Sequence, residues 1–460
     1  MLLVAMFVAC KTAKDIVKPE APLPIGYRYA TSTDTMSIAA IKWDAFFADP
    51  ALQQLLTRAI ANNYDMQLAV KNIEVAQLLL KQTRWSYLPD ARLQVTASSN
   101  RPSGNSLNGL STESFLGTKH IEDYSANVAL SWEADIWGKI KNKKAGALAA
   151  YLQTEEARKW VQTNLVANVS EGFYNLLMLD AQLAIAKKNI SLNDSTLNII
   201  RLQFNAGQVT ALAIQQAEAQ KLTAAALIPQ LEENIAIQEN ALRLLSGDLP
   251  SSVQRHTLLS QAMLSDNLSA GVPAALLSSR PDVRSFELEL TRANAQVGIS
   301  KADLYPTINI TASGGLNSIS ATNWFNVPAS LFGVVAGGIV QPLLQKRQLR
   351  TAYEIAKVDR ERVVIQFRQS VLNAVGEVSN ALVRVEKLQA AKQITQERVQ
   401  TLQKAIINSN LLFKTGMATY LEVITAQGNS LQSELELAAI IREQLSAKVE
   451  LYRSLGGGWR

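Results

Sequence analysis

The chain has 460 residues, of which 48% are hydrophobic, so it is long enough for one large core or several domains. It contains one cysteine and two histidines, which nearly excludes a clustered His/Cys metal site and a Cys–His catalytic pair. The net charge is +6, but the basic residues are scattered along helical faces without a dense basic arm or an aromatic platform, so nucleic-acid binding is not expected.

The N-terminal residues predict secretion and a lipid anchor. Residues 1–9 are apolar and end in a small alanine, as the end of a signal peptide does. The segment from Phe7 to Cys10 resembles a bacterial lipobox, in which the cysteine is acylated, although leucine is commoner than phenylalanine at the position of Phe7. A buried or incidental Cys10 is the alternative. The polar, proline-containing stretch that follows is expected to begin a lipid-anchored tether over residues 10–50.

The rest of the chain is an internal repeat with an offset near 209 residues. The most similar residues are Phe204, Gly207 and Thr210, which return as Phe413, Gly416 and Thr419. A repeat of this kind predicts two structural units with the same architecture. We expect a first repeat at 51–250, an inter-repeat equatorial segment at 251–278 and a second repeat at 279–460.

Four segments predict strands that cross a membrane. The sequence has no run of about 18 apolar residues, so a membrane-spanning form of this chain would have to use strands. The strands are expected at about 91–100 and 123–134 in the first repeat, and at 306–314 and 330–340 in the second. Most of them alternate between apolar and polar residues, as outer-membrane strands do. A half-buried soluble sheet gives the same alternation and remains the alternative for any single strand.

Aromatic residues and strand number favour the membrane interpretation. Aromatic side chains occur at or just beyond the strand ends, where interfacial girdles form: Trp85, Tyr87, Trp132, Trp137, Tyr305 and Trp324. Four strands cannot close a barrel, and open edges are not tolerated in lipid. Closure therefore requires several copies, and three copies would supply twelve strands.

Each repeat ends in a long helical hairpin, expected at 139–247 and 346–455. The first helix of each hairpin runs for about 66 residues without proline, which corresponds to roughly 100 Å. Helices of this length must pack in a bundle or coil. A plain structural coiled coil is the alternative to a membrane-linked bundle.

The same turn closes both hairpins. Gly207 and Gly416 are expected in the left-handed conformation that ends a helix. Thr210 and Thr419 are expected to act as N-caps of the returning helices.

Basic residues open both long helices. They are Lys139, Lys141, Lys143 and Lys144 in the first and Lys346, Arg347 and Arg350 in the second. Cations are unfavourable at a helix N-terminus. They are expected either to contact anionic lipid headgroups or to form a solvated collar.

Three motifs together resemble the TolC-type outer-membrane efflux channels, in the NodT/OprM-like lipoprotein branch. They are Ser279–Asp282 (SRPD), Asp135–Lys139 (DIWGK) and Leu451–Trp459 (LYRSLGGGW). The resemblance covers essentially the whole chain after Cys10. It departs from the family at the second strand-to-helix junction, where relatives often have a glycine and this chain has Gln345-Lys346-Arg347.

The resemblance implies a mixed α and β fold. A homotrimer would form a twelve-stranded outer-membrane β-barrel, with four strands per chain, continuous with a long periplasmic α-helical barrel. It implies a passive exit duct for small molecules, working with a periplasmic adaptor and an inner-membrane pump of the RND type. The protein would be lipid-anchored in the bacterial outer membrane, in contact with outer-membrane lipid, without enzymatic activity or cofactor. A lipid-anchored periplasmic coiled-coil scaffold without a pore is the alternative, and a surface adhesin is less well supported.

The resemblance also implies a periplasmic gate after the second turn. Leu421 matches the apolar constriction position, and Thr425 stands where relatives commonly have aspartate. Glu422 is a hypothetical replacement, because three glutamates in a ring would favour cations, although Glu422 could equally face solvent.

The hairpin tips, residues 204–212 and 413–421, are expected to dock an adaptor hairpin. The candidate docking residues are Phe204, Gly207, Thr210, Phe413, Gly416 and Thr419. The alternative is that the two phenylalanines only staple their own turns.

Overall fold

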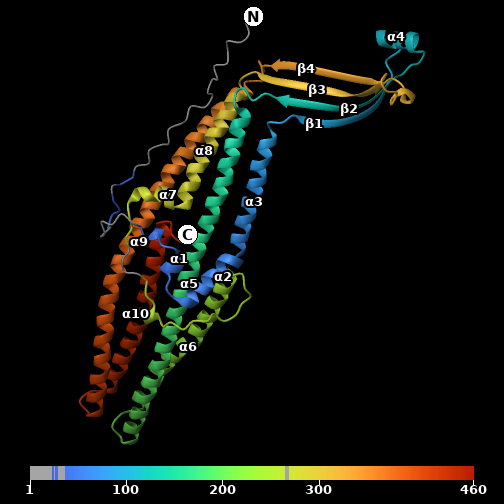
Figure 1. Ribbon diagram of the computed structural model, residues 1–460. Helices are drawn as coiled ribbons and strands as arrows, with labels where there is room; N and C mark the ends of the chain where they lie inside the picture. The colour runs from blue at the N-terminus through green and yellow to red at the C-terminus, as the bar shows by residue number, and fades with distance from the viewer. Residues whose placement is uncertain (1–22, 25, 30–36, 265–268) are drawn as a thin grey trace. The chain divides into compact units, whose positions relative to one another are not determined.

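A computed structural model describes residues 23–24, 26–29, 37–264 and 269–460 of the chain (Figure 1). Cys10 and the predicted signal segment lie outside the described residues. Within them the helices are α1 Trp43–Phe46, α2 Pro50–Asn62, α3 Tyr64–Trp85, α4 Leu107–Leu116, α5 Lys139–Asn205, α6 Ala211–Leu245, α7 Leu276–Ser279, α8 Pro281–Ala302, α9 Gln348–Lys414 and α10 Tyr420–Ser454. The strands are β1 Asp90–Asn100, β2 Ile121–Glu133, β3 Thr307–Ser318 and β4 Leu331–Val340. Across this part of the chain, the search for a helix apolar and long enough to traverse a bilayer finds none.

The described residues form two compact units, and each unit draws on both sequence repeats. One contains Glu74–Leu152 and Leu288–Ile365, and the other contains Glu20–Ile73, Gln153–Glu287 and Gln366–Arg460. The division therefore does not follow the boundary between the repeats, because strands from both repeats pair in one sheet.

The four strands form one antiparallel sheet in the order β1-β2-β3-β4, as Figure 1 shows. The register aligns Ala91 with Leu130, Leu130 with Ala312 and Ala312 with Val335. Paired residues of neighbouring strands lie on the same face of a sheet, so this register forms an apolar row across all four strands. Val335 is 80% exposed in the single chain. The sheet thus presents an apolar face that the other described residues leave uncovered there.

The two helical hairpins have matching lengths. The long helices α5 and α9 have 67 residues each, and the returning helices α6 and α10 have 35 each. At 1.5 Å per residue, each long helix measures about 100 Å. This equality is the clearest structural expression of the sequence repeat.

Two local features differ from expectation. The second long helix begins at Gln348, because Lys346 and Arg347 have φ angles of 48° and 62° and form a turn before it. The loop between β1 and β2 contains helix α4, whose N-cap Ser106 accepts a hydrogen bond from the backbone of Gly109 at 3.1 Å. The sequence predicted strands at about 91–100 and 123–134 and no helix between them.

The main core lies in the unit that includes Gln153–Glu287 and Gln366–Arg460, and so the larger part of both hairpins. Tyr452, near the end of α10, stacks on Phe46 with ring centroids 4.1 Å apart. Its hydroxyl donates to the backbone oxygen of Ile41 at 2.6 Å. The C-terminal motif is therefore packed, because it joins α10 to the N-terminal part of this unit.

Candidate functional site

Left-handed glycines end both long helices. Gly207 and Gly416 have φ angles of 73° and 76°, which confirms the predicted conformation. The backbone N–H of Gln208 donates to Gln203, and that of Met417 donates to Leu412. These bonds satisfy carbonyl groups that a helix end would otherwise leave open. The chain reverses in five residues at each tip, between Asn205 and Ala211 and between Lys414 and Tyr420.

The returning helices begin after Thr210 and Thr419, but only the second tip has a carboxylate cap. The backbone N–H of Thr419 donates to the Glu422 carboxylate at 2.6 Å, and the Thr419 hydroxyl donates to the same oxygen. Hydrogen bonding from Thr419 holds the pKa of Glu422 below its usual range. Ala213 occupies the equivalent position in the first tip. The two tips are therefore chemically different, and the carboxylate remains ionised in weak acid.

The repeated phenylalanines have different environments. Phe413 is only 3% exposed, whereas Phe204 is 42% exposed. Phe413 belongs to a small core formed with Leu197, Ile200, Ala213, Ala217 and Val423. That core contains residues of both hairpins, so Phe413 joins them, whereas much of the Phe204 ring is accessible.

The three predicted gate residues lie in the first turns of α10. Leu421 is 54% exposed, and Glu422 and Thr425 are also exposed in the single chain. Leu421 and Thr425 are four residues apart and therefore share a helix face. The structure connects Glu422 to Thr419, while the side chains of Leu421 and Thr425 are exposed in the single chain.

A buried polar contact near the tips was not predicted. Gln427 is 1% exposed, and its amide donates to the hydroxyl of Thr196 at 2.9 Å. It joins α10 to α5. The corresponding position of the first repeat is Glu218, which is an exposed residue. The replacement of this charged residue by a neutral amide in the second repeat was the signal in the sequence that Gln427 is buried.

The role of Arg280 was not predicted either. Its motif indicated a helix start, and α8 does begin at Pro281. The Arg280 guanidinium is buried, and it pairs with Asp282 at 2.6 Å and with Glu377 at 2.9 Å. It also donates to the backbone oxygen of Ser454 at 3.0 Å. Arg280 therefore connects the start of α8 to α9 and to the end of α10.

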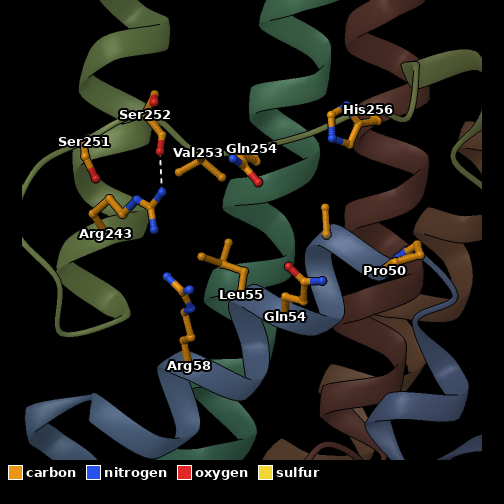
Figure 2. Close-up of a pocket in the computed structure, with 11 residues that line it drawn as sticks. Pro50, Gln54, Leu55, Arg58, Arg243, Ser251, Ser252, Val253, Gln254 and His256 are labelled. Carbon is orange, nitrogen blue, oxygen red and sulfur yellow. Dashed lines mark hydrogen bonds between the residues drawn. The ribbon is translucent and has the colours of Figure 1, made fainter.

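The segment predicted as equatorial packs against the helices of the first hairpin. Arg255 forms ion pairs with Asp180 of α5 and Glu239 of α6, each at 2.5 Å. Figure 2 shows the adjoining pocket, about 470 Å³ in volume, where Arg243 donates to the backbone oxygen of Ser252. Arg243 is also 3.5 Å from Asp248, so its positive charge is partly neutralised. These contacts fasten the segment to the hairpin and do not resemble a catalytic centre.

Comparison with known proteins identifies the type of protein that has this architecture. The sequence pattern of a family described as "Outer membrane efflux protein" matches residues 55–248 and 272–457. The chain is 26% identical to the cation efflux system protein CusC of Escherichia coli, over 98% of this chain and 96% of CusC. It is 30% identical to the solvent efflux pump outer membrane protein SrpC of Pseudomonas putida, over 100% of this chain and 97% of SrpC. A crystal structure of CusC superimposes with a TM-score of 0.87, at 26% identity, over 98% of this chain and 100% of that one.

Proposed function

The chain belongs to the outer membrane efflux protein family, and we propose from this that it is the exit duct of a tripartite export system. Membership of the family establishes one part of this function, namely that the chain is an outer-membrane channel. The observation that carries the proposal is the combination, in one chain, of a sheet with an uncovered apolar face and two 67-residue helices that end in matched turns. Such a duct supplies a path, and the energy for transport comes from its partners.

We propose a homotrimer, because a single sheet has two free edges. In the part of the chain that the structure describes, β1 and β4 each pair with only one other strand, and open edges are not tolerated in lipid. Three copies would bring twelve strands together, enough to close a barrel.

The sequence repeat supports the same assembly at the hairpin tips. Within the chain, Phe413 of the second hairpin packs near Leu197 and Ala217 of the first. Adding the repeat offset to those two positions gives Ile406 and Ala426 of the second hairpin. If the same hairpin-to-hairpin contact repeats between neighbouring copies of the trimer, the exposed Phe204 of one copy would cover Ile406 and Ala426 of the next.

The tip contact predicts a crosslink between copies. Phe204→Cys combined with Ala426→Cys should give disulfide-linked dimers and trimers on a non-reducing gel after oxidation. Each single-cysteine variant controls for disulfides formed through Cys10 and for disulfides formed by random collision between copies. Monomers alone from the double variant would contradict the proposed contact.

The trimeric duct predicts a conducting particle. Purified protein in detergent should have a mass near three times 50.2 kDa by light scattering, and it should give stable unitary conductance in a planar lipid bilayer. A silent trimer would indicate a closed periplasmic end. A monomer that stays soluble without detergent after Cys10→Ala would support the scaffold alternative.

The hairpin tips are the proposed docking site for a periplasmic adaptor, which in turn would contact an inner-membrane pump of the RND type. Phe204, Gly207 and Thr210 form one half of this surface, and Gly416 and Thr419 contribute to the other. Phe413 is proposed to support the surface from beneath, because its ring is buried. CusC is named for cations and SrpC for solvents, so we propose that the duct accepts whatever its pump delivers.

Leu421, Glu422 and Thr425 are proposed to line the periplasmic gate. In this arrangement three Glu422 carboxylates would favour cations, and their lowered pKa would preserve this preference in weak acid. Glu422→Gln should reduce the cation-to-anion permeability ratio toward the ratio of free ionic mobilities, as measured from reversal potentials across a salt gradient.

Glu233→Gln is the matched control for this experiment, because it removes an exposed carboxylate of α6 outside the gate. It should leave the permeability ratio unchanged. An unchanged ratio in Glu422→Gln would exclude Glu422 from the conducting path.

A further inference from the structure

Two adjacent basic residues adopt a backbone conformation that favours glycine. Lys346 has a φ angle of 48° and Arg347 one of 62°, in the turn between β4 and α9. In this region the β-carbon of an L-residue crowds the backbone, so glycine would fit the turn with less strain. Local stability therefore does not explain why both positions carry long cationic side chains.

These two cations also lack a counter-ion in the described part of the chain, where no carboxylate lies within 4.0 Å of either. Other cations near the strand ends differ in this respect. Lys139 is 3.0 Å from Asp303 and 3.5 Å from Glu133, and Arg350 is 3.4 Å from Glu354. Lys346 and Arg347 are both exposed and can contact a ligand outside the chain.

Two apolar residues lie shortly before this pair, separated from it by Gln345, and both are highly accessible. Leu343 is 85% exposed and Leu344 is 94% exposed. Both follow the end of β4 at Val340. Two exposed leucines next to two unneutralised cations form an amphipathic segment, Leu343–Arg347, which we call the junction segment.

The junction segment lies at the edge of the sheet where β1 and β3 begin and β2 and β4 end. Aromatic residues mark the same edge. Trp137 stacks on Tyr305 with ring centroids 4.7 Å apart, and its indole N–H donates to Pro306 at 2.7 Å. Trp132 donates to the backbone oxygen of Tyr87 at 2.9 Å. Aromatic rings with a satisfied polar atom are typical of the boundary between hydrocarbon and headgroups.

We propose that the junction segment binds anionic phospholipid of the periplasmic leaflet. Leu343 and Leu344 enter the hydrocarbon, and Lys346 and Arg347 contact the phosphate groups. The fork of the arginine suits a phosphate, and both cations are attracted to a negative membrane surface. The strained turn places the two cations beside the leucines. This inference rests on the proposed function, because it requires that the sheet lie in the outer membrane.

Two double variants separate lipid binding from backbone strain. Lys346→Gln/Arg347→Gln removes the charges but keeps a side chain at each position, whereas Lys346→Gly/Arg347→Gly removes the charges and relieves the strain. The matched control is Lys187→Gln/Lys404→Gln, which removes two exposed charges from α5 and α9. All variants are made in the full chain and purified in detergent.

The measurement is the number of phosphatidylglycerol and phosphatidylcholine molecules retained per protein, counted by native mass spectrometry at equal lipid concentration. Wild type and control should retain more phosphatidylglycerol, and both junction variants should retain the two lipids equally. The glycine variant should also melt at a higher temperature than the glutamine variant in lipid-free detergent, because only glycine relieves the turn.

A glutamine variant that still prefers phosphatidylglycerol, or a wild-type protein without preference, would overturn the proposal. Equal melting of the glycine and glutamine variants would overturn the role of strain. Unitary conductance in planar bilayers is measured in parallel. Retained conductance with lost lipid preference would leave the exit duct intact, whereas a wild-type protein that is monomeric and gives no conductance would contradict the proposed function itself.

Discussion

Replacing Phe413 with alanine is expected to destabilise the periplasmic tips by about 3 kcal/mol or more, the usual cost of removing a buried aromatic ring. The ring is 3% exposed and packs among residues of both hairpins, including Leu197 and Val423. Its loss leaves a cavity that two long helices can fill only by shifting. Amide hydrogen exchange near residues 197–200 should accelerate by roughly 100-fold, because each 1.4 kcal/mol corresponds to about a factor of ten.

The repeat provides the matched control for this experiment. Phe204→Ala removes the same side chain from the equivalent position, but that ring is 42% exposed. Exchange within the tips of the isolated chain should change much less, and the effect should fall on contacts between copies or with an adaptor. Equal acceleration in the two variants would contradict the different roles assigned to the two rings.

Replacing Arg280 with methionine is expected to lower the free energy of unfolding by about 3 kcal/mol, the low end for breaking a buried ion pair. Burial acts to lower the pKa of Arg280, but its hydrogen bonds and charge interactions with Asp282 and Glu377 outweigh this and raise it. The group therefore stays charged while buried. Arg453 also lies 3.3 Å from Glu377. Glu377 therefore keeps one cationic partner in the variant, which limits the loss of stability. Denaturant unfolding of the detergent-solubilised protein measures the change.

Arg292→Ala is the control for this prediction. Arg292 pairs with Glu289 at 2.9 Å, but its side chain is 54% exposed. Solvent screens such a pair, so the loss should stay below about 1 kcal/mol. If Arg280→Met is no more damaging than Arg292→Ala, the connection from α8 to α9 and α10 is not important for stability.

Much of the local structure could be predicted because it depends on residues close together in the chain. The alternation from Arg92 to Ser98 requires only neighbours two positions apart, and β1 spans Asp90–Asn100. The ends of the long helices depend on Gly207 and Gly416, whose left-handed conformation is a property of glycine itself. The family resemblance added the channel fold, which the structural likeness to CusC confirms.

The start of α9 shows where a local pattern is insufficient. Helix-forming composition predicted a helix from Lys346, but Lys346 and Arg347 adopt positive φ angles. The end of β4 fixes the position from which the chain must enter the helix. This geometric requirement outweighs the preference of Lys346 and Arg347 for negative φ angles.

The sequence by itself determined the strands, the two long hairpins and their tight turns, because each of these depends on short-range spacing. It also determined the repeat, because similar residues recur at an offset near 209. Only the tertiary structure decided that Phe413 is buried and Phe204 exposed, although both stand at equivalent positions of the repeat. It also decided that Arg280 joins three helices and that Gln427 meets Thr196. Burial and ion pairing depend on residues that are distant in the chain. The packing of one hairpin against the other brings together the partners of Phe413 and Gln427, and the packing of the start of α8 against α9 and α10 brings together those of Arg280.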